Sequence, residues 1–159
     1  MKGQIQQVFI YILTIVIVGI ILLIGYRSII GLTEKSCQVE RTTFETNLES
    51  FILKYTSYGS LHKETMSAPC SYSQICFVDA EAISKKETLI NAPKIIGNSV
   101  KEGIEQNVFL VKKDFVEPIT FMTEIEVENN FFVCINNTNG KFYIKFEGLG
   151  KTTAISGVN

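Results

Sequence analysis

Residues Val8–Ile24 read VFIYILTIVIVGIILLI. Fourteen of these seventeen residues are Ile, Leu, Val or Phe, and no charged side chain occurs in the 24 residues from Gly3 to Tyr26. A helix of that length spans roughly 36 Å, which exceeds the ~30 Å hydrocarbon core of a bilayer. At about 0.3 to 0.6 kcal/mol each, the apolar side chains favour insertion by roughly 4–8 kcal/mol. The sequence therefore predicts a leader and transmembrane helix in residues 1–30.

A cleaved secretory signal is the alternative for this segment. Such a signal has an apolar region of about 7–15 residues that closes on a small-x-small cleavage site. Here the run is longer, and Gly25-Tyr26-Arg27-Ser28 follows it. We therefore expect the helix to stay attached, with the N-terminus inside the cell and the C-terminal domain outside. The lysines and arginines alone favour the opposite orientation, whereas the cysteines favour export.

The rest of the chain is long enough for one domain with its own core. Among 159 residues, 15 Lys and Arg stand against 16 Asp and Glu, so no basic surface points to nucleic acid. Residues 31–59 are expected to form a linker and an amphipathic helix, from about Thr33 to Tyr58. One apolar stripe at helical spacing supports it: Cys37, Phe44, Leu48, Phe51, Ile52 and Tyr55.

From residue 60 onward the apolar pattern changes to period two, which is typical of strands. Phe142, Ile144 and Phe146 alternate with polar residues in the segment 141–147, and similar patterns mark 123–128 and 131–136. With turns at 129–130 and 137–140, these three segments predict an antiparallel meander. Further strands are expected at 74–79, 107–112, 115–121 and 152–155. A short helix is expected from Pro93 to Gly103, with Ile95, Ile96, Val100 and Ile104 facing inward. The predicted class is α+β, with the long helix packed on an antiparallel sheet in a β-rich head, residues 60–159.

The four cysteines, Cys37, Cys70, Cys76 and Cys134, all lie in the part expected outside the cell. Four cysteines permit three pairings, and the sequence does not choose among them. A local Cys70–Cys76 bridge would leave Cys37 to pair with Cys134. Buried free thiols and a zinc site are the alternatives, and the spacing with a single histidine fits zinc poorly. Export favours two disulfides.

No catalytic constellation is apparent. His62, the only histidine, has no recognisable catalytic partner in the sequence. The pattern of residues Gly148–Thr152 fits a hairpin turn better than a phosphate-binding loop. The row of Glu124, Glu126 and Glu128 could bind calcium. Such a row of carboxylates is more typical of the solvent face of a strand. Lys141 and Lys145 on the neighbouring ladder would then offset the repulsion between the glutamates. We predict no enzyme activity, cofactor or metal. Asn136-Asn137-Thr138 is an N-glycosylation sequon on a predicted turn, with Asn136 as the acceptor.

Met1-Lys2-Gly3-Gln4-Ile5, followed directly by the apolar run, resembles the N-terminus of archaeal type IV pilin-like proteins, which carry a class III signal. In that family a prepilin peptidase cuts on the cytoplasmic side of the helix, and the resemblance places the cut between Gly3 and Gln4. It implies that the retained helix packs into a filament core and that the head is pilin-like. The resemblance covers about the first 30 residues.

These observations lead to a functional hypothesis: a single-pass, membrane-anchored extracellular structural protein that forms a pilin-like subunit of a surface filament used for adhesion or as an appendage. Its expected partners are the lipid bilayer, copies of itself and a prepilin peptidase, with no nucleic acid. The alternative is a solitary single-pass protein that presents a binding module outside the cell.

Overall fold

The structure is a computed structural model that describes residues 2–113, 115–127 and 131–158, and side-chain surroundings from residue 8 onward except at residues 30–34. As predicted, it is α+β, with an N-terminal apolar helix and antiparallel sheets. Helix α1 runs from Lys2 to Lys54. The chain forms two compact units, residues 1–39 and residues 40–159, and we call the second unit the head.

In the first unit, Val8–Ile29 is a helical segment long and apolar enough to cross a membrane, as the sequence predicts. None of this segment is buried by the chain that the structure describes. In this segment the hydroxyl of Thr14 donates a hydrogen bond of 2.8 Å to the carbonyl of Ile10. The helix therefore satisfies this polar group internally, which an apolar environment requires.

The head contains two four-stranded sheets, and we call the first sheet A. Its strand order is β1-β7-β8-β5, antiparallel throughout except for the parallel pair β5–β8. Strand β7 is central and alternates between buried and partly exposed residues. The bounds are Leu61–Ser67 for β1, Lys141–Gly148 for β7, Thr153–Gly157 for β8 and Ile125–Glu126 for β5.

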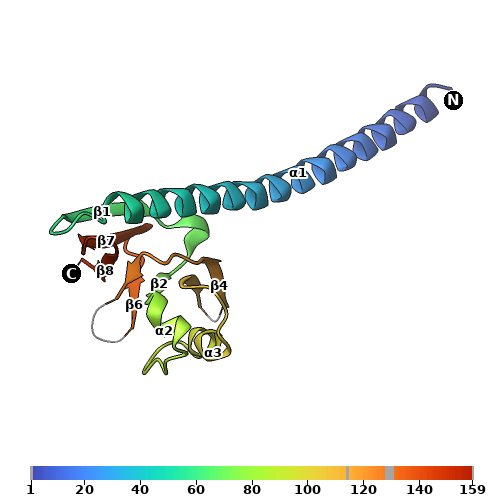
Figure 1. Cartoon of the computed structure of the whole chain (residues 1–159). Coiled ribbons are helices and arrows are strands. Elements are labelled where there is room, and N and C mark those ends of the chain that lie inside the picture. Colours follow the sequence, from blue (N-terminus) through green and yellow to red (C-terminus); the bar gives the residue numbers. More distant parts are fainter. Residues whose placement is uncertain (1, 114, 128–130, 159) are drawn as a thin grey trace. The chain divides into compact units, whose positions relative to one another are not determined.

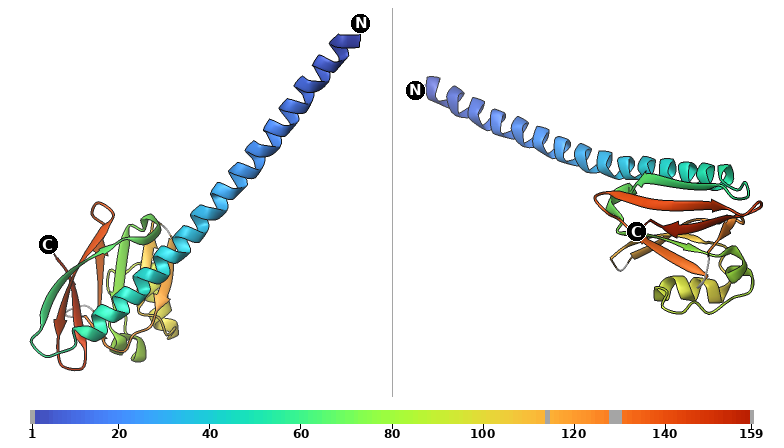
Figure 2. Two further views of the ribbon diagram at one scale, coloured as in Figure 1. Left: turned by 90° about the horizontal axis from the view of Figure 1, so that it is seen from above. Right: turned by 90° about the vertical axis from the view of Figure 1, so that its left-hand side faces the viewer.

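Sheet B has the order β4-β3-β2-β6 and is antiparallel throughout. Two short helices follow its strand β2 in the chain and lie against the sheet on the side away from the last turns of α1 (Figures 1 and 2). The bounds are Gln74–Val78 for β2, Val108–Lys112 for β3, Phe115–Thr120 for β4, Phe132–Asn136 for β6, Ala80–Ser84 for α2 and Lys94–Glu102 for α3.

Two apolar clusters hold the head together. The larger joins α1, sheet A and one face of sheet B, and the smaller lies between the other face of sheet B and helices α2 and α3. Each large aliphatic side chain that folding buries stabilises the head by about 1.5–3 kcal/mol. The predicted inward residues in the larger cluster are confirmed: Phe44, Leu48, Ile52, Tyr55, Phe142, Ile144 and Phe146.

The C-terminal end of α1 is held by the β7–β8 hairpin. The hydroxyl of Thr153 donates to the carbonyl of Ile52 over 2.8 Å, and the amide of Gly150 donates to the carbonyl of Thr56 over 2.7 Å. The first of these bonds satisfies a carbonyl group in the last turn of α1, which the helix itself leaves without a partner. Gly148 lies so close that a Cβ there would be 2.1 Å from the carbonyl oxygen of Ser57. Only glycine allows this approach.

The predicted meander is wrong, although strands β5, β6 and β7 occur within the three predicted segments. Strand β6 pairs with β2 in sheet B, whereas β7 lies between β1 and β8 in sheet A. The physical reason is that β6 has apolar residues on both faces and therefore lies between the two clusters. Ile135 contributes to the larger cluster and Phe132 packs against the smaller one. The predicted turn residues Asn129 and Asn130, and Glu128, lie outside the described residues.

Four smaller predictions also need correction. The long helix ends at Lys54 rather than near Tyr58, and the mostly polar segment Leu61–Ser67 forms β1, for which no strand was predicted. Helix α3 confirms the predicted short helix, with Ile96 and Val100 fully buried, but Ile95 and Ile104 are about half exposed. The expected solvent row of glutamates does not face Lys141 and Lys145, because the neighbour of β5 is β8.

Candidate functional site

All four cysteines of the chain are disulfide-bonded, as predicted. Cys76 is bonded to Cys134, so the local Cys70–Cys76 bridge considered from the sequence is wrong. The physical reason is strand register: Cys76 and Cys134 lie directly opposite each other on β2 and β6. Cys37 and Cys70 are each in the disulfide form as well. A bond across a separation of 58 residues restricts the unfolded chain by roughly 4 kcal/mol in the chain-entropy model.

The two other groups of predicted site residues lie far apart in the chain. Gly3 and Gln4 belong to the first turn of α1, and their side-chain surroundings lie outside the description. Asn136 is the last residue of β6 and is exposed. Its Oδ1 accepts a hydrogen bond of 2.7 Å from the amide of Gln74.

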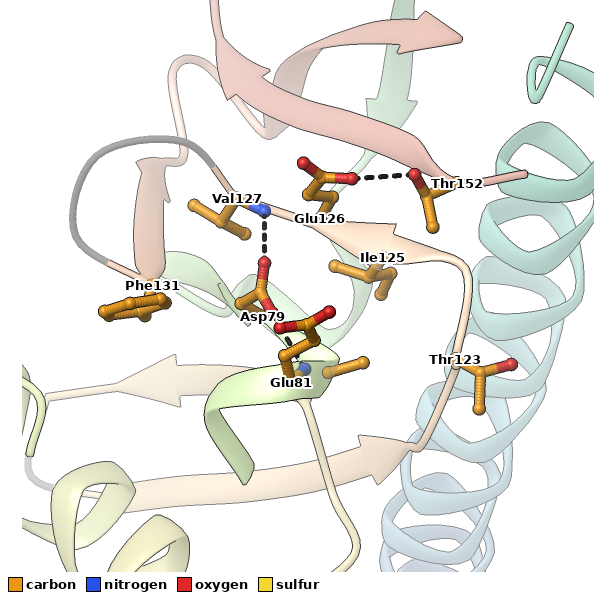
Figure 3. A pocket seen from close by; sticks show the side chains of 9 residues that line it. Asp79, Glu81, Thr123, Ile125, Glu126, Val127, Phe131 and Thr152 are labelled. Carbon is orange, nitrogen blue, oxygen red and sulfur yellow. Dashed lines mark hydrogen bonds between the residues drawn. The ribbon is translucent and has the colours of Figure 1, made fainter. Parts of the chain in front are cut away.

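A cleft of about 450 Å³ opens in the head where β2 ends, α2 begins and β5 passes the β7–β8 hairpin (Figure 3). Its lining combines three carboxylates, two threonine hydroxyls and an apolar part that includes an exposed aromatic ring. The lining residues are Asp79, Ala80, Glu81, Thr123, Ile125, Glu126, Val127, Phe131 and Thr152.

Asp79 forms the floor of the cleft and is only 7% exposed. One carboxylate oxygen accepts from the amide of Glu81 at 2.8 Å and thereby caps the N-terminus of α2. The other oxygen accepts from the amide of Val127 at 3.0 Å, just after β5 (Figure 3). Asp79 therefore ties the end of β2, in sheet B, to the strand at the edge of sheet A. Asp79 was not predicted as a site residue, although an aspartate before the sequence AEAIS is a recognisable helix cap.

The two glutamates of the cleft have partners of their own. Glu126 accepts a hydrogen bond of 2.7 Å from the hydroxyl of Thr152. Glu81 lies 2.6 Å from the ammonium of Lys85, and this hydrogen bond and charge lower the pKa of Glu81 and raise that of Lys85. Both groups of this ion pair are well exposed.

The charged side chains among the described lining residues are all acidic. Among the residues that the structure describes, the lining has three carboxylates and no basic side chain, which favours cationic or hydroxyl-rich groups over anions. Both oxygens of Asp79 accept hydrogen bonds from backbone amides, and the described lining residues include no Ser, Cys or His. In the part of the chain that the structure describes, no three His, Cys, Asp or Glu residues come together as a metal site.

Two tyrosine–carboxylate pairs connect α1, or the residue that follows it, to the strands of the head. No sequence pattern predicts either pair. The hydroxyl of Tyr72 donates to Glu117, which also accepts from Arg41 of α1. Burial, together with the hydrogen bond and charge of Glu117, raises the pKa of Tyr72 to about 12, and the charge of Arg41 opposes the rise.

The second pair involves the only histidine of the chain. The hydroxyl of Tyr55 donates to Glu64 over 2.5 Å, and this hydrogen bond is the main reason that the pKa of Tyr55 is raised. The ring of His62 stacks on the ring of Tyr55, with 4.0 Å between their centres. His62 is exposed, as the sequence analysis expects, but it has an aromatic neighbour.

Comparison of this chain with models of protein families, with curated proteins and with solved structures finds no match.

Proposed function

We propose that this chain is a membrane-anchored extracellular structural protein, a pilin-like subunit of a cell-surface filament. The observation that carries the proposal is the segment Val8–Ile29, a continuous apolar helix of which the described chain buries nothing. Soluble monomeric proteins rarely expose so large an apolar surface. The segment therefore needs another apolar environment, which either lipid or copies of the same helix can supply.

The bilayer is the first of these environments. The segment has the length of a membrane span, and Tyr11 and Tyr26 stand near its two ends, where aromatic rings favour the interface. A prepilin peptidase that cuts between Gly3 and Gln4 would remove only the leader and would leave this anchor intact.

Copies of the helix in a filament core are the second environment. From Val8 to Ile24, Gly19 is the only residue smaller than threonine, so the close backbone contact that drives helix pairing in lipid is not encoded. Association of the helices outside the bilayer has a different driving force from pairing in lipid. The competing solvent is then water, so burial of apolar surface drives the association. The apolar surface of this segment suits that second step.

The chemistry of the head supports an outward location. Disulfides form and persist in oxidising compartments and are rare in the cytosol. All four cysteines are disulfide-bonded, and Cys76 is fully buried within the head. A head that depends on such bonds suits the outside of the cell.

N-terminal sequencing of the protein from native membranes and surface appendages tests the proposal. We expect the chain to begin at Gln4 and an antibody against the head to label filaments in electron micrographs. The variant Gly3→Val should block processing, keep Met1 and abolish labelled filaments, while Gly19→Ala serves as a matched glycine control. An intact Met1 in the native protein, together with a membrane fraction that holds only single chains, would contradict the proposal.

The cleft favours a second candidate function, a solitary single-pass protein that presents a binding module. Its acidic and hydroxyl-bearing lining, with Phe131 46% exposed at its edge, has the mixed character of a ligand site. This candidate predicts an unprocessed chain and no labelled appendage, so the same experiment separates the two functions.

A further inference from the structure

We propose that Asn136 carries an N-linked glycan, an inference that rests on the proposed outward location of the head. The chain contains a single Asn-x-Ser/Thr sequence with no proline in the middle, Asn136-Asn137-Thr138. A sequon is a short pattern that also arises by chance. The geometry of its side chains supplies independent support.

The amide nitrogen of Asn136 is available for substitution. The residue is exposed at the end of β6, and its Oδ1 accepts from the side-chain amide of Gln74 at 2.7 Å. Its Nδ2, the atom that a glycan joins, makes no hydrogen bond to any residue that the structure describes. A sugar on Nδ2 therefore leaves the bond to Gln74 in place and buries no polar group.

Two other asparagines show the contrast. Asn107 is fully buried, and its Nδ2 donates to the carbonyl of Met122 at 2.7 Å. The Nδ2 of Asn137 donates to the carbonyl of Tyr72, also at 2.7 Å. In both residues this atom already donates a bond that holds the fold together, so an attached saccharide would have to fit beside that bond. Asn136, the one asparagine that the sequon selects, is free of that constraint.

The remainder of the sequon lies on an ordered surface corner. Thr138 is exposed and exchanges two backbone hydrogen bonds with Lys141, of 2.9 and 3.1 Å. Between them, Asn139 and Gly140 both have left-handed backbone angles, with φ of 54° and 78°. This is the geometry of a tight turn, and it follows the exposed acceptor Asn136 directly.

The chemistry needs a saccharide joined through phosphate to a lipid carrier as the co-reactant. The Nδ2 atom attacks the anomeric carbon of the saccharide, so that a carbon–nitrogen bond forms while the carbon–oxygen bond to the phosphate breaks. The phosphate leaves with the bonding electron pair, and the amide nitrogen loses one proton to a base of the transferring enzyme. No atom is oxidised or reduced. A membrane-bound transferase that uses lipid-linked saccharides is therefore the partner that this site requires.

The test is mass spectrometry of the full chain expressed in its native host, together with the peptide that contains Asn136. We expect the peptide to exceed its sequence mass by one saccharide. Asn136→Gln and Thr138→Val should abolish the added mass, whereas Thr138→Ser preserves the sequon and should keep it. This pair at position 138 separates loss of the sequon from any effect of changing the turn.

A membrane-impermeant amine reagent applied to intact cells separates this inference from the proposed function. The exposed lysines Lys63 and Lys101 report whether the head faces outward. If these lysines are labelled but the Asn136 peptide has its plain sequence mass, the glycan is refuted and the outward location stands. If they are unlabelled and the peptide is unmodified, both proposals are wrong.

Discussion

Helix α1 contains two apolar regions whose surroundings differ. In residues 8–24 nearly every side chain is apolar, and the described chain covers none of them. In residues 44–54 most of the apolar side chains form a single stripe, which the rest of the head buries. The first region therefore depends on lipid or on other copies, whereas the second depends on the protein's own fold. The same substitution should accordingly affect the head in one region and leave it unchanged in the other.

Truncating a leucine should show the largest difference between the regions. Leu48 is fully buried in the larger cluster, so Leu48→Ala should lower the free energy of unfolding of the head by about 2–5 kcal/mol. Leu22 is 68% exposed, and Leu22→Ala should change that free energy by less than about 0.5 kcal/mol. Urea unfolding of the full chain in detergent, followed by tyrosine fluorescence, measures both. Equal losses would mean that the head and the span unfold as one unit.

Adding a methyl group to a glycine should give a smaller contrast of the same kind. Gly148→Ala places a Cβ against the carbonyl oxygen of Ser57 and should destabilise the head by about 1–3 kcal/mol. Gly19 has nothing within 4 Å of such an atom, so Gly19→Ala should leave the head unchanged. The urea midpoint is again the measurement. An unchanged midpoint in Gly148→Ala would show that the hairpin and the end of α1 are not in close contact.

Replacing a threonine hydroxyl should have a weaker effect still. Thr153→Val removes the donor to the carbonyl of Ile52 at the buried end of α1 and should cost about 0.5–1.5 kcal/mol. The bond of Thr14 stays within its own helix turn, so Thr14→Val should not affect the head. Thermal unfolding monitored by circular dichroism distinguishes the two variants. If Thr153→Val has the same melting temperature as the unsubstituted protein, this hydrogen bond does not stabilise the end of α1.

The smallest effect should appear only in alkali. The folded head raises the pKa of Tyr72 to about 12, above the usual value near 10. Tyr72 therefore contributes its full stabilisation below pH 10 and loses it as the pH rises toward 12, because the unfolded chain releases its proton first. Tyr72→Phe should flatten the fall in urea midpoint between pH 10 and pH 12. Tyr26→Phe, in the apolar segment, is the control, and identical alkaline slopes in both variants would contradict the assignment.

Local periodicity explains why much of the fold could be predicted. The helical stripe from Phe44 to Tyr55 and the alternation of Phe142, Ile144 and Phe146 were both correct, because a regular element must turn its apolar residues toward a core. Strand β1 was missed for the same reason. Only Met66 of its seven residues is buried, so this edge strand carries almost no periodic signal.

The site was harder to predict because its contacts are not local. The cleft is lined by residues between 79 and 152 in the sequence, which come from α2, β5 and the connections between strands. The capping role of Asp79 could have been recognised from the sequence, but its bond to Val127 could not, since 48 residues separate the two. Likewise, the sequon alone marks Asn136, and only the fold leaves its Nδ2 without an intramolecular bond among the described residues.

The apolar span, the amphipathic half of α1 and most strand positions could be predicted from the sequence alone. These properties follow from composition and from periods of a few residues. Only the tertiary structure decided that β5 pairs with β8, that β6 joins sheet B, and that Cys76 bonds Cys134 rather than Cys70. Pairing partners compete across the whole chain, and burying both faces of β6 outweighs its nearness in sequence to β7.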